Sequence, residues 1–113
     1  MLKITHNPRC SKSRETLKLI QEKGAQVEIR EYLKDELTKE ELSEILKKLG
    51  KKPSEILRKG EPIFKEKYKG KTFTEQEWLE IMIANPKLIE RPIVYDDKDA
   101  ELGRPPENVL RLL

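Results

Sequence analysis

The fold is decided by residues 2–30, which read LKITHNPRCSKSRETLKLIQEKGAQVEIR. Residues 2–5 predict a short strand, which the following His-Asn-Pro ends. A helix is predicted from Ser11, because apolar residues recur along one stripe until Gly24, a residue typical of the position after a last helical turn. Residues 25–30 alternate between apolar and polar side chains, which predicts a second, half-buried strand. The apolar side chains that would face the core there are those of Ala25, Val27 and Ile29.

Two helices in the middle of the chain are predicted by the capping-box pattern, a Thr followed three residues later by Glu. The two pairs are Thr38 with Glu41 and Thr74 with Glu77. The first helix carries its apolar residues on one face and is ended by Gly50, whereas the second carries Trp78 and stops before Pro86. Residues 51–70 lie between them, contain Pro, Gly and many charges, and predict short irregular helical turns.

The last part of the chain predicts a hairpin followed by a helix. Residues 93–95 predict a strand, residues 96–98 a turn and residues 100–102 a brief return strand. Pro105 and Pro106 suit the first turn of a closing helix. The side chains expected to face inward from that helix are those of Val109, Leu110 and Leu113.

The order of these elements predicts the fold class. A right-handed crossover makes the first two strands parallel, and the hairpin adds an antiparallel pair. Strand, helix, strand, then helices, then hairpin and helix is the thioredoxin arrangement, an α/β fold in which helices flank a mixed four-stranded sheet. Residues 1–113 then form a single domain, and about residues 36–85 form a helical insertion within it.

The composition excludes several classes of protein. The 24 basic and 21 acidic residues are interspersed, the net charge is +3, and there is no basic block of the kind that binds nucleic acid. No apolar run is long enough for a signal peptide or a membrane span. A single cysteine excludes an internal disulfide, which a secreted protein of this size would usually need. We therefore expect a cytoplasmic monomer without nucleic-acid or membrane partners.

Cys10 lies between the first predicted strand and the first helix, where several backbone N–H groups have no helical partner. These donors and the positive end of the helix dipole favour the thiolate, which is the nucleophilic form of cysteine. Arg9, Lys12 and Arg14 add positive charge nearby. A lone cysteine is often only a small buried hydrophobe, but these charged neighbours make a poor apolar site. The sequence therefore predicts an activated thiolate.

Two further residues can support this cysteine. Ser13, three residues after Cys10, can offer its hydroxyl to the sulfur. His6 can either donate to the thiolate or be a hydrogen-bonded core residue, and both interpretations stay open. The CxxS spacing leaves the chain without a second thiol, so an external thiol must release any adduct on Cys10. Glutathione and a glutaredoxin are the natural candidates.

Four segments together resemble the glutaredoxin-coupled arsenate reductase family, which also contains the Spx regulators. These segments are HNPRCSKSR at residues 6–14, ILRK at 56–59, ERPIV at 90–94 and GRPP at 103–106. They follow the order of the family and span nearly the whole chain. The short arsenate-reductase-like branch is the most similar part of that family.

The resemblance implies a thioredoxin-like fold with a helical insertion and an active site that pairs Cys10 with Arg58, Arg91 and Arg104. It also implies that the peptide bond before Pro92 is cis and that this proline packs near the nucleophile. Guanidinium groups bind tetrahedral oxyanions in a bidentate way, so three of them would hold arsenate and favour the thiolate.

The implied activity is that of an oxidoreductase, an arsenate reductase. Cys10 attacks arsenate, water leaves and a thioarsenate adduct forms. Glutathione then displaces this adduct, and glutaredoxin reduces the product so that arsenite is released. We expect no bound cofactor and no metal, with glutathione as the reductant.

Two other functions stay open. The same scaffold can act as a different glutathione-linked thiol reductase, for example on a glutathione mixed disulfide. An Spx-like regulator that binds RNA polymerase fits less well, because those proteins use CxxC where this chain has CSKS. Surface ion pairs are the alternative role for any arginine in so charged a chain, and we assign Arg30 and Arg111 to them.

Overall fold

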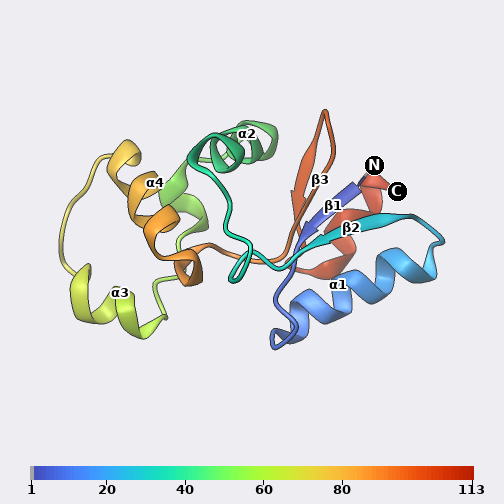
Figure 1. Ribbon diagram of the computed structural model, residues 1–113, viewed down its shortest axis with the longest axis horizontal. Coiled ribbons are helices and arrows are strands. Elements are labelled where there is room, and N and C mark those ends of the chain that lie inside the picture. The colour runs from blue at the N-terminus through green and yellow to red at the C-terminus, as the bar shows by residue number, and fades with distance from the viewer. Residues whose placement is uncertain (1) are drawn as a thin grey trace.

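The computed structural model describes residues 2–113 and shows a four-stranded sheet with helices packed on both faces (Figure 1). The strands are β1 (Leu2–Thr5), β2 (Val27–Arg30), β3 (Ile93–Tyr95) and β4 (Ala100–Leu102). The α-helices are α1 (Ser11–Glu22), α2 (Lys39–Leu49), α3 (Pro62–Lys67) and α4 (Glu75–Ala84). The 3₁₀ helices are η1 (Pro53–Ile56), η2 (Pro86–Leu88) and η3 (Pro106–Leu112).

The strands lie in the order β2-β1-β3-β4. β1 runs parallel to β2, with Ile4 opposite Ile29, and antiparallel to β3, with Ile4 opposite Val94. β3 and β4 form the predicted antiparallel hairpin. The mixed sheet and the thioredoxin-like α/β fold that the element order predicts are therefore confirmed.

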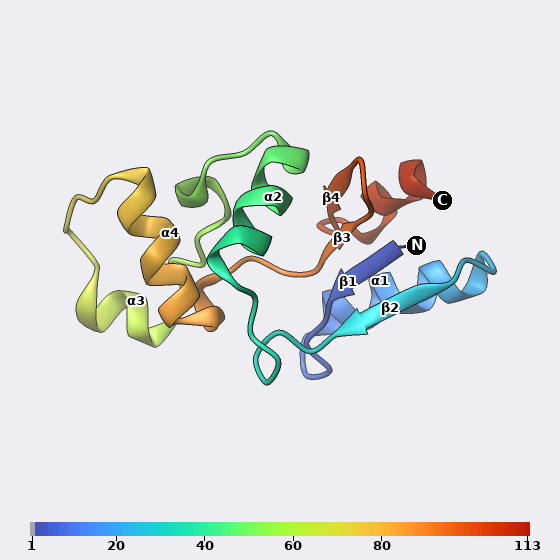
Figure 2. The same ribbon diagram turned by 45° about the horizontal axis from the view of Figure 1, so that its top comes forward.

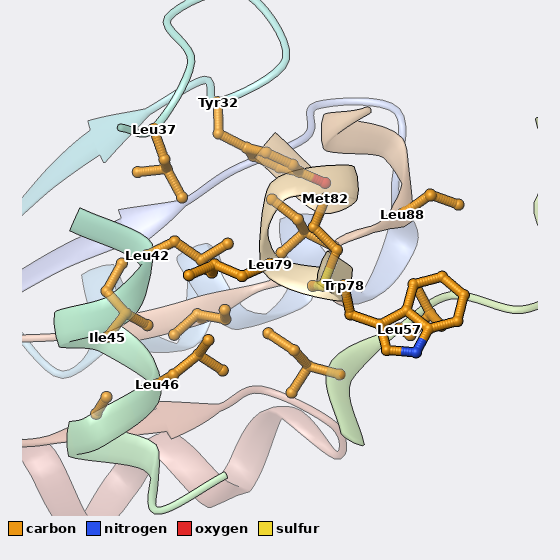
Figure 3. Packing of buried hydrophobic residues seen from close by; sticks show 14 of the residues in the cluster. Tyr32, Leu37, Leu42, Ile45, Leu46, Leu57, Trp78, Leu79, Met82 and Leu88 are labelled. Carbon is orange, nitrogen blue, oxygen red and sulfur yellow. The ribbon is translucent and has the colours of Figure 1, made fainter. Parts of the chain in front are cut away.

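The sheet separates two clusters of buried apolar side chains. The cluster between the sheet, α1 and η3 consists of Leu2, Ile4, Ile20, Val94 and Val109. The larger cluster, on the other face, packs β3 and β4 against the helices between β2 and β3 in the sequence. Figure 3 shows side chains of α2 and α4, among them Leu42 and Leu79, meeting in this cluster. In Figures 1 and 2 these helices, coloured green to orange, form a group on the side of the sheet away from α1.

Both predicted capping boxes are present. The Thr38 hydroxyl accepts from the Glu41 N–H at 3.1 Å, and the Glu41 carboxylate accepts from the Thr38 N–H at 2.9 Å. The same reciprocal pair begins α4. Gly50 ends α2 in the left-handed region with φ of 67°, where a side chain would be strained. Within residues 2–113, no helix combines the length and the apolar character that crossing a membrane requires.

Two sequence predictions about buried side chains are wrong. Ile29 is 46% exposed, because β2 is an edge strand with a neighbouring strand on one side only. In the closing helix Leu110 and Leu113 are exposed rather than inward. That helix is 3₁₀ with three residues per turn, so Val109 shares its face with the residues three before and three after it.

The two arginines assigned to surface ion pairs form them. Arg30 pairs with Glu41 at 2.7 Å and with Asp35, and Arg111 pairs with Asp99 at 2.6 Å and with the Glu101 carboxylate. Because the Arg111 pairs are half exposed, they contribute little to the free energy of unfolding.

An aromatic group attaches the short helix α3 to α4. The ring of Trp78 lies 4.8 Å from that of Phe73 and 6.1 Å from those of Phe64 and Tyr68, measured between ring centroids. Aromatic pairs at such separations attract each other beyond the effect of area burial alone. α3 has no fully buried residue, so these rings supply much of its packing.

Gly103, directly after β4, lies close to Thr16 of α1 and to the Pro92 ring. A Cβ at this position would lie 2.7 Å from the Thr16 hydroxyl oxygen and 2.9 Å from the Pro92 ring. The Gly103 N–H also donates to the Pro92 carbonyl at 2.8 Å. The missing side chain therefore leaves room for Thr16 of α1 and the Pro92 ring beside the Gly103 backbone.

We predict that Gly103→Ala destabilises the fold by about 1–3 kcal/mol, because the added methyl overpacks a contact between two ordered segments. The measurement is urea unfolding followed by circular dichroism. Gly60→Ala is the matched control, since a Cβ at Gly60 meets nothing within 4 Å. Equal unfolding midpoints for the two variants would contradict this account of the contact.

Candidate active site

Cys10 is the N-cap residue of α1, with φ of −93° and ψ of 123° and a half-buried side chain. The loop before it is held by Asn7, whose side-chain oxygen accepts from the Arg9 N–H at 3.0 Å and whose carbonyl accepts from the Cys10 N–H at 2.9 Å. The Arg14 side chain donates to the Pro8 carbonyl at 3.0 Å. Three separate contacts therefore fix the backbone that presents the sulfur.

The pKa of the Cys10 thiol lies below its ordinary value. Burial alone would raise this pKa, but the backbone N–H of Ser13, the Arg91 guanidinium and the backbone N–H of Lys12 outweigh it. The first turn of α1 contains no acidic residue to oppose them. The arrangement is the one expected for a nucleophilic thiolate at a helix N-terminus.

Two of the three predicted arginines meet the sulfur. Arg104 points its Nη2 at Cys10 Sγ from 3.7 Å, and its Nε donates to the Arg91 carbonyl at 2.6 Å. The Arg91 guanidinium also stabilises the thiolate form of Cys10 and so lowers its pKa. The Arg91–Pro92 peptide bond is cis, as the sequence resemblance implies. The Pro92 ring and the Thr16 side chain of α1, the helix that Cys10 caps, both lie close to Gly103.

Arg58 occupies a different position in the cluster. Its Nη1 donates to Glu90 Oε1 at 2.8 Å, and the same oxygen lies 2.9 Å from Arg104 Nε. Glu61 lies 3.9 Å from Arg58. The Glu90 carboxylate therefore connects Arg58 to Arg104, and Arg104 contacts the sulfur.

A short backbone pairing explains how Arg58 reaches this place. Leu57 and Ile89 form an antiparallel bridge. The Arg58 N–H donates to the Leu88 carbonyl, and the Glu90 N–H donates to the Ile56 carbonyl, both at 2.8 Å. The segment after η1 is thereby aligned with the segment that leads into β3.

Ser13 and His6 contact each other. His6 Nδ1 lies 2.7 Å from the Ser13 hydroxyl, which also accepts from the Asn7 N–H at 3.0 Å. The Ser13 hydroxyl therefore bonds to His6 and Asn7 instead of to the sulfur, which is the partner that the sequence predicts. Ser13 lowers the pKa of Cys10 through its backbone N–H. Burial lowers the pKa of His6. Of the two interpretations left open, the hydrogen-bonded core histidine describes its position.

Sequence reasoning missed two residues of this site. Glu90 stands directly before Arg91 in the ERPIV segment, and a carboxylate next to expected anion-binding arginines is a signal that could have been followed. Tyr32 is fully buried, and the charges of Arg91, Arg58 and Cys10 all act on its hydroxyl. A lone tyrosine after a predicted strand gave no such indication.

A pocket of about 480 Å³ opens beside the Cys10 loop. Arg91 and His6 line it, and Arg9, Lys34 and Lys87 add positive charge. Glu31 and Glu61 also line it, so the pocket has both signs of charge.

Within residues 2–113 no three His, Cys, Asp or Glu side chains are grouped closely enough to hold a metal ion.

We predict that Arg91→Ala raises the pKa of Cys10, because it removes the guanidinium that stabilises the thiolate. Alkylation by iodoacetamide, measured as rate against pH, should show a midpoint displaced upward and a slower reaction at neutral pH. Arg111→Ala is the control, since Arg111 pairs with Asp99 and Glu101 on the surface. An unchanged midpoint in Arg91→Ala would refute the assigned role of Arg91.

We also predict that burial holds the pKa of His6 below the ordinary histidine value of about 6.5. The unfolded chain then binds a proton at a higher pH than the folded chain, so stability declines as pH falls from 6.5 toward the folded pKa. His6 is the single histidine in the chain, so one imidazole signal in an NMR titration reports it. A midpoint at or above that of the urea-unfolded protein would disprove the effect of burial.

Comparison with known proteins gives a consistent assignment. The model of the ArsC family matches residues 5–112. The chain is 43% identical to the uncharacterized protein YfgD of Escherichia coli, over 99% of this chain and 96% of that protein. It is 40% identical to an arsenate reductase of Haemophilus influenzae, over 97% of each. A solved structure, an arsenate reductase from Vibrio cholerae, superposes with a TM-score of 0.93 at 39% identity and covers 99% of this chain and 97% of its own.

The family match spans nearly the whole described chain, and the relatives share its length as well as its sequence. The structural similarity extends over the same residues. The chain therefore belongs to the ArsC family.

Proposed function

We propose that this protein is an oxidoreductase that reduces arsenate, with Cys10 as its nucleophile. The observation that carries the proposal is the Cys10 sulfur at the N-terminus of α1, with Arg104 Nη2 at 3.7 Å and a lowered thiol pKa. Relatives described as arsenate reductases support the choice of substrate. Arsenate is a tetrahedral oxyanion, and guanidinium groups match the spacing of its oxygens.

Arg91 and Arg104 bind arsenate beside the sulfur, and Arg58 extends the binding site through Glu90. The thiolate attacks arsenic, a sulfur–arsenic bond forms, and one arsenate oxygen takes up protons and leaves as water. The fixed guanidiniums also stabilise the negative charge that gathers on the remaining oxygens during this attack.

Release of the adduct needs thiols from outside the chain. Cys10 is the single cysteine, and Ser13 at the CxxS position is bonded to His6. Glutathione attacks arsenic, so that a glutathione–arsenic bond forms and the Cys10–arsenic bond breaks. A glutaredoxin thiol then attacks the glutathione sulfur, and the electron pair of the broken sulfur–arsenic bond stays on arsenic, which leaves as arsenite. These two thiols supply the two electrons that convert arsenate to arsenite and end as a mixed disulfide, while Cys10 is restored as a thiolate. Because this cycle needs reduced thiols, we place it in the cytoplasm.

A second candidate function is reduction of a glutathione mixed disulfide. The pocket of about 480 Å³ beside the Cys10 loop is larger than a tetrahedral oxyanion requires, and its mixed charge suits a peptide thiol. In that reaction the thiolate attacks the glutathione sulfur and releases the other thiol. Regulation of RNA polymerase has no comparable support.

We predict that Cys10→Ser loses arsenate reduction in the presence of glutathione and glutaredoxin, by on the order of 10³-fold or more, because a serine hydroxyl is not ionised at neutral pH. Arsenite release is the measurement. The variant should keep its thermal stability, since Ser is a preferred N-cap and Cys10 makes no capping bond with its side chain.

Three outcomes separate the candidates. Retained arsenate reduction in folded Cys10→Ser would refute the mechanism. A wild-type protein that turns over a glutathionylated peptide far faster than arsenate would favour the second function. Turnover of arsenate that needs no added thiol would contradict the external resolving step.

A further inference from the structure

Three buried side-chain nitrogen or oxygen atoms within residues 2–113 have no hydrogen-bond partner, and all three belong to the candidate site. They are Tyr32 Oη, Arg58 Nε and Arg91 Nε. Buried polar atoms in native proteins are nearly always paired, and an unpaired one is costly. Three of them around one cysteine indicate that a ligand with several acceptor atoms completes their bonding.

Tyr32 has the least expected position of the three. It lies two residues after β2 ends, and its ring belongs to the larger apolar cluster, so the side chain is fully buried. Figure 3 shows the ring reaching into this cluster with the hydroxyl at its far end. Packing fixes the ring on apolar neighbours, which leaves the hydroxyl in a set position.

The chemistry of its neighbours decides what the Tyr32 hydroxyl can do. The Arg91 guanidinium lies beside it without hydrogen-bond geometry, the charge of Arg58 also acts on it, and a guanidinium only donates hydrogen bonds. Neither arginine can therefore accept the phenolic proton. Burial raises the pKa of Tyr32, so the hydroxyl keeps this proton at neutral pH. It is therefore a hydrogen-bond donor without an acceptor.

We propose that the Tyr32 hydroxyl is an oxyanion-binding group, which donates a hydrogen bond to an oxygen of the tetrahedral substrate that the arginines of the site hold beside the sulfur. The inference rests on the proposed function for the identity of the substrate. Tyr32 adds a neutral donor to a site otherwise built from charges, so it contributes to affinity without changing the net charge around the thiolate.

The test measures anion binding without chemistry. Arsenate, or phosphate as its isostere, should protect Cys10 of the wild-type protein from iodoacetamide. In Tyr32→Phe the anion concentration that halves the alkylation rate should rise about tenfold, as expected for one lost hydrogen bond to an anion. The protection of each variant is measured against its own alkylation rate without anion. Tyr95→Phe is the matched control, because Tyr95 is also buried in the larger cluster and its pKa is likewise raised by burial.

A thermal-unfolding measurement distinguishes binding from a structural role. Without anion, Tyr32→Phe should unfold at the wild-type temperature or above it, because the hydroxyl it removes is unpaired. The rise in unfolding temperature that saturating phosphate gives the wild-type protein should shrink in Tyr32→Phe and persist in Tyr95→Phe.

Equal protection of wild-type and Tyr32→Phe proteins would overturn the inference, as would a wild-type protein that neither anion protects. Destabilised Tyr32→Phe with unchanged protection would also overturn it. Weakened protection in Tyr32→Phe supports the inference even where the wild-type protein binds arsenate but does not reduce it with glutathione and glutaredoxin. That last result would instead refute the proposed function.

Discussion

The backbone N–H groups at the first turn of α1 act on the Cys10 sulfur, and this contact constrains the rest of the site. The contact depends on the loop before Cys10, which Asn7 and Arg14 hold in place by hydrogen bonds to its backbone. The site also depends on segments far apart in the sequence that lie together around Cys10. Arg104, which is 94 residues from Cys10 in the sequence, contacts the sulfur and also donates to the Arg91 carbonyl.

The charges of the site form a connected set. Three guanidiniums, one thiolate and the Glu90 carboxylate lie together, and Glu90 Oε1 is shared between Arg58 and Arg104. A carboxylate in this position holds both side chains in place and offsets part of their charge before an anion arrives. Preorganised groups of this kind do not have to reorient when substrate binds.

Much of the fold follows from local sequence signals, because each acts over a few residues. The capping boxes at Thr38 and Thr74, the stop at Gly50 and the hairpin at residues 93–102 are all set by neighbouring residues. The errors come from tertiary context. The exposure of Ile29 depends on the place of β2 at the edge of the sheet. The exposure of Leu110 depends on a helix that is 3₁₀ rather than α.

The site was less predictable for the same reason. Cys10 could be found from its neighbours, and the arginines from a family resemblance. The groups around Arg58 and Tyr32 come from segments far apart in the chain. The Ser13 hydroxyl could bond either to the sulfur or to His6, and the structure has the bond to His6. Periodicity and spacing in the sequence do not encode such choices.

The aromatic group around Trp78 has a practical consequence. Trp78 is the single tryptophan and belongs to α4, while the single thiol belongs to the start of α1. Indole fluorescence therefore reports the environment of the helices between β2 and β3, and labelling of the thiol reports the start of α1. The chain thus contains one reporter at the start of α1 and one in α4, which can show whether these two regions unfold together or in sequence.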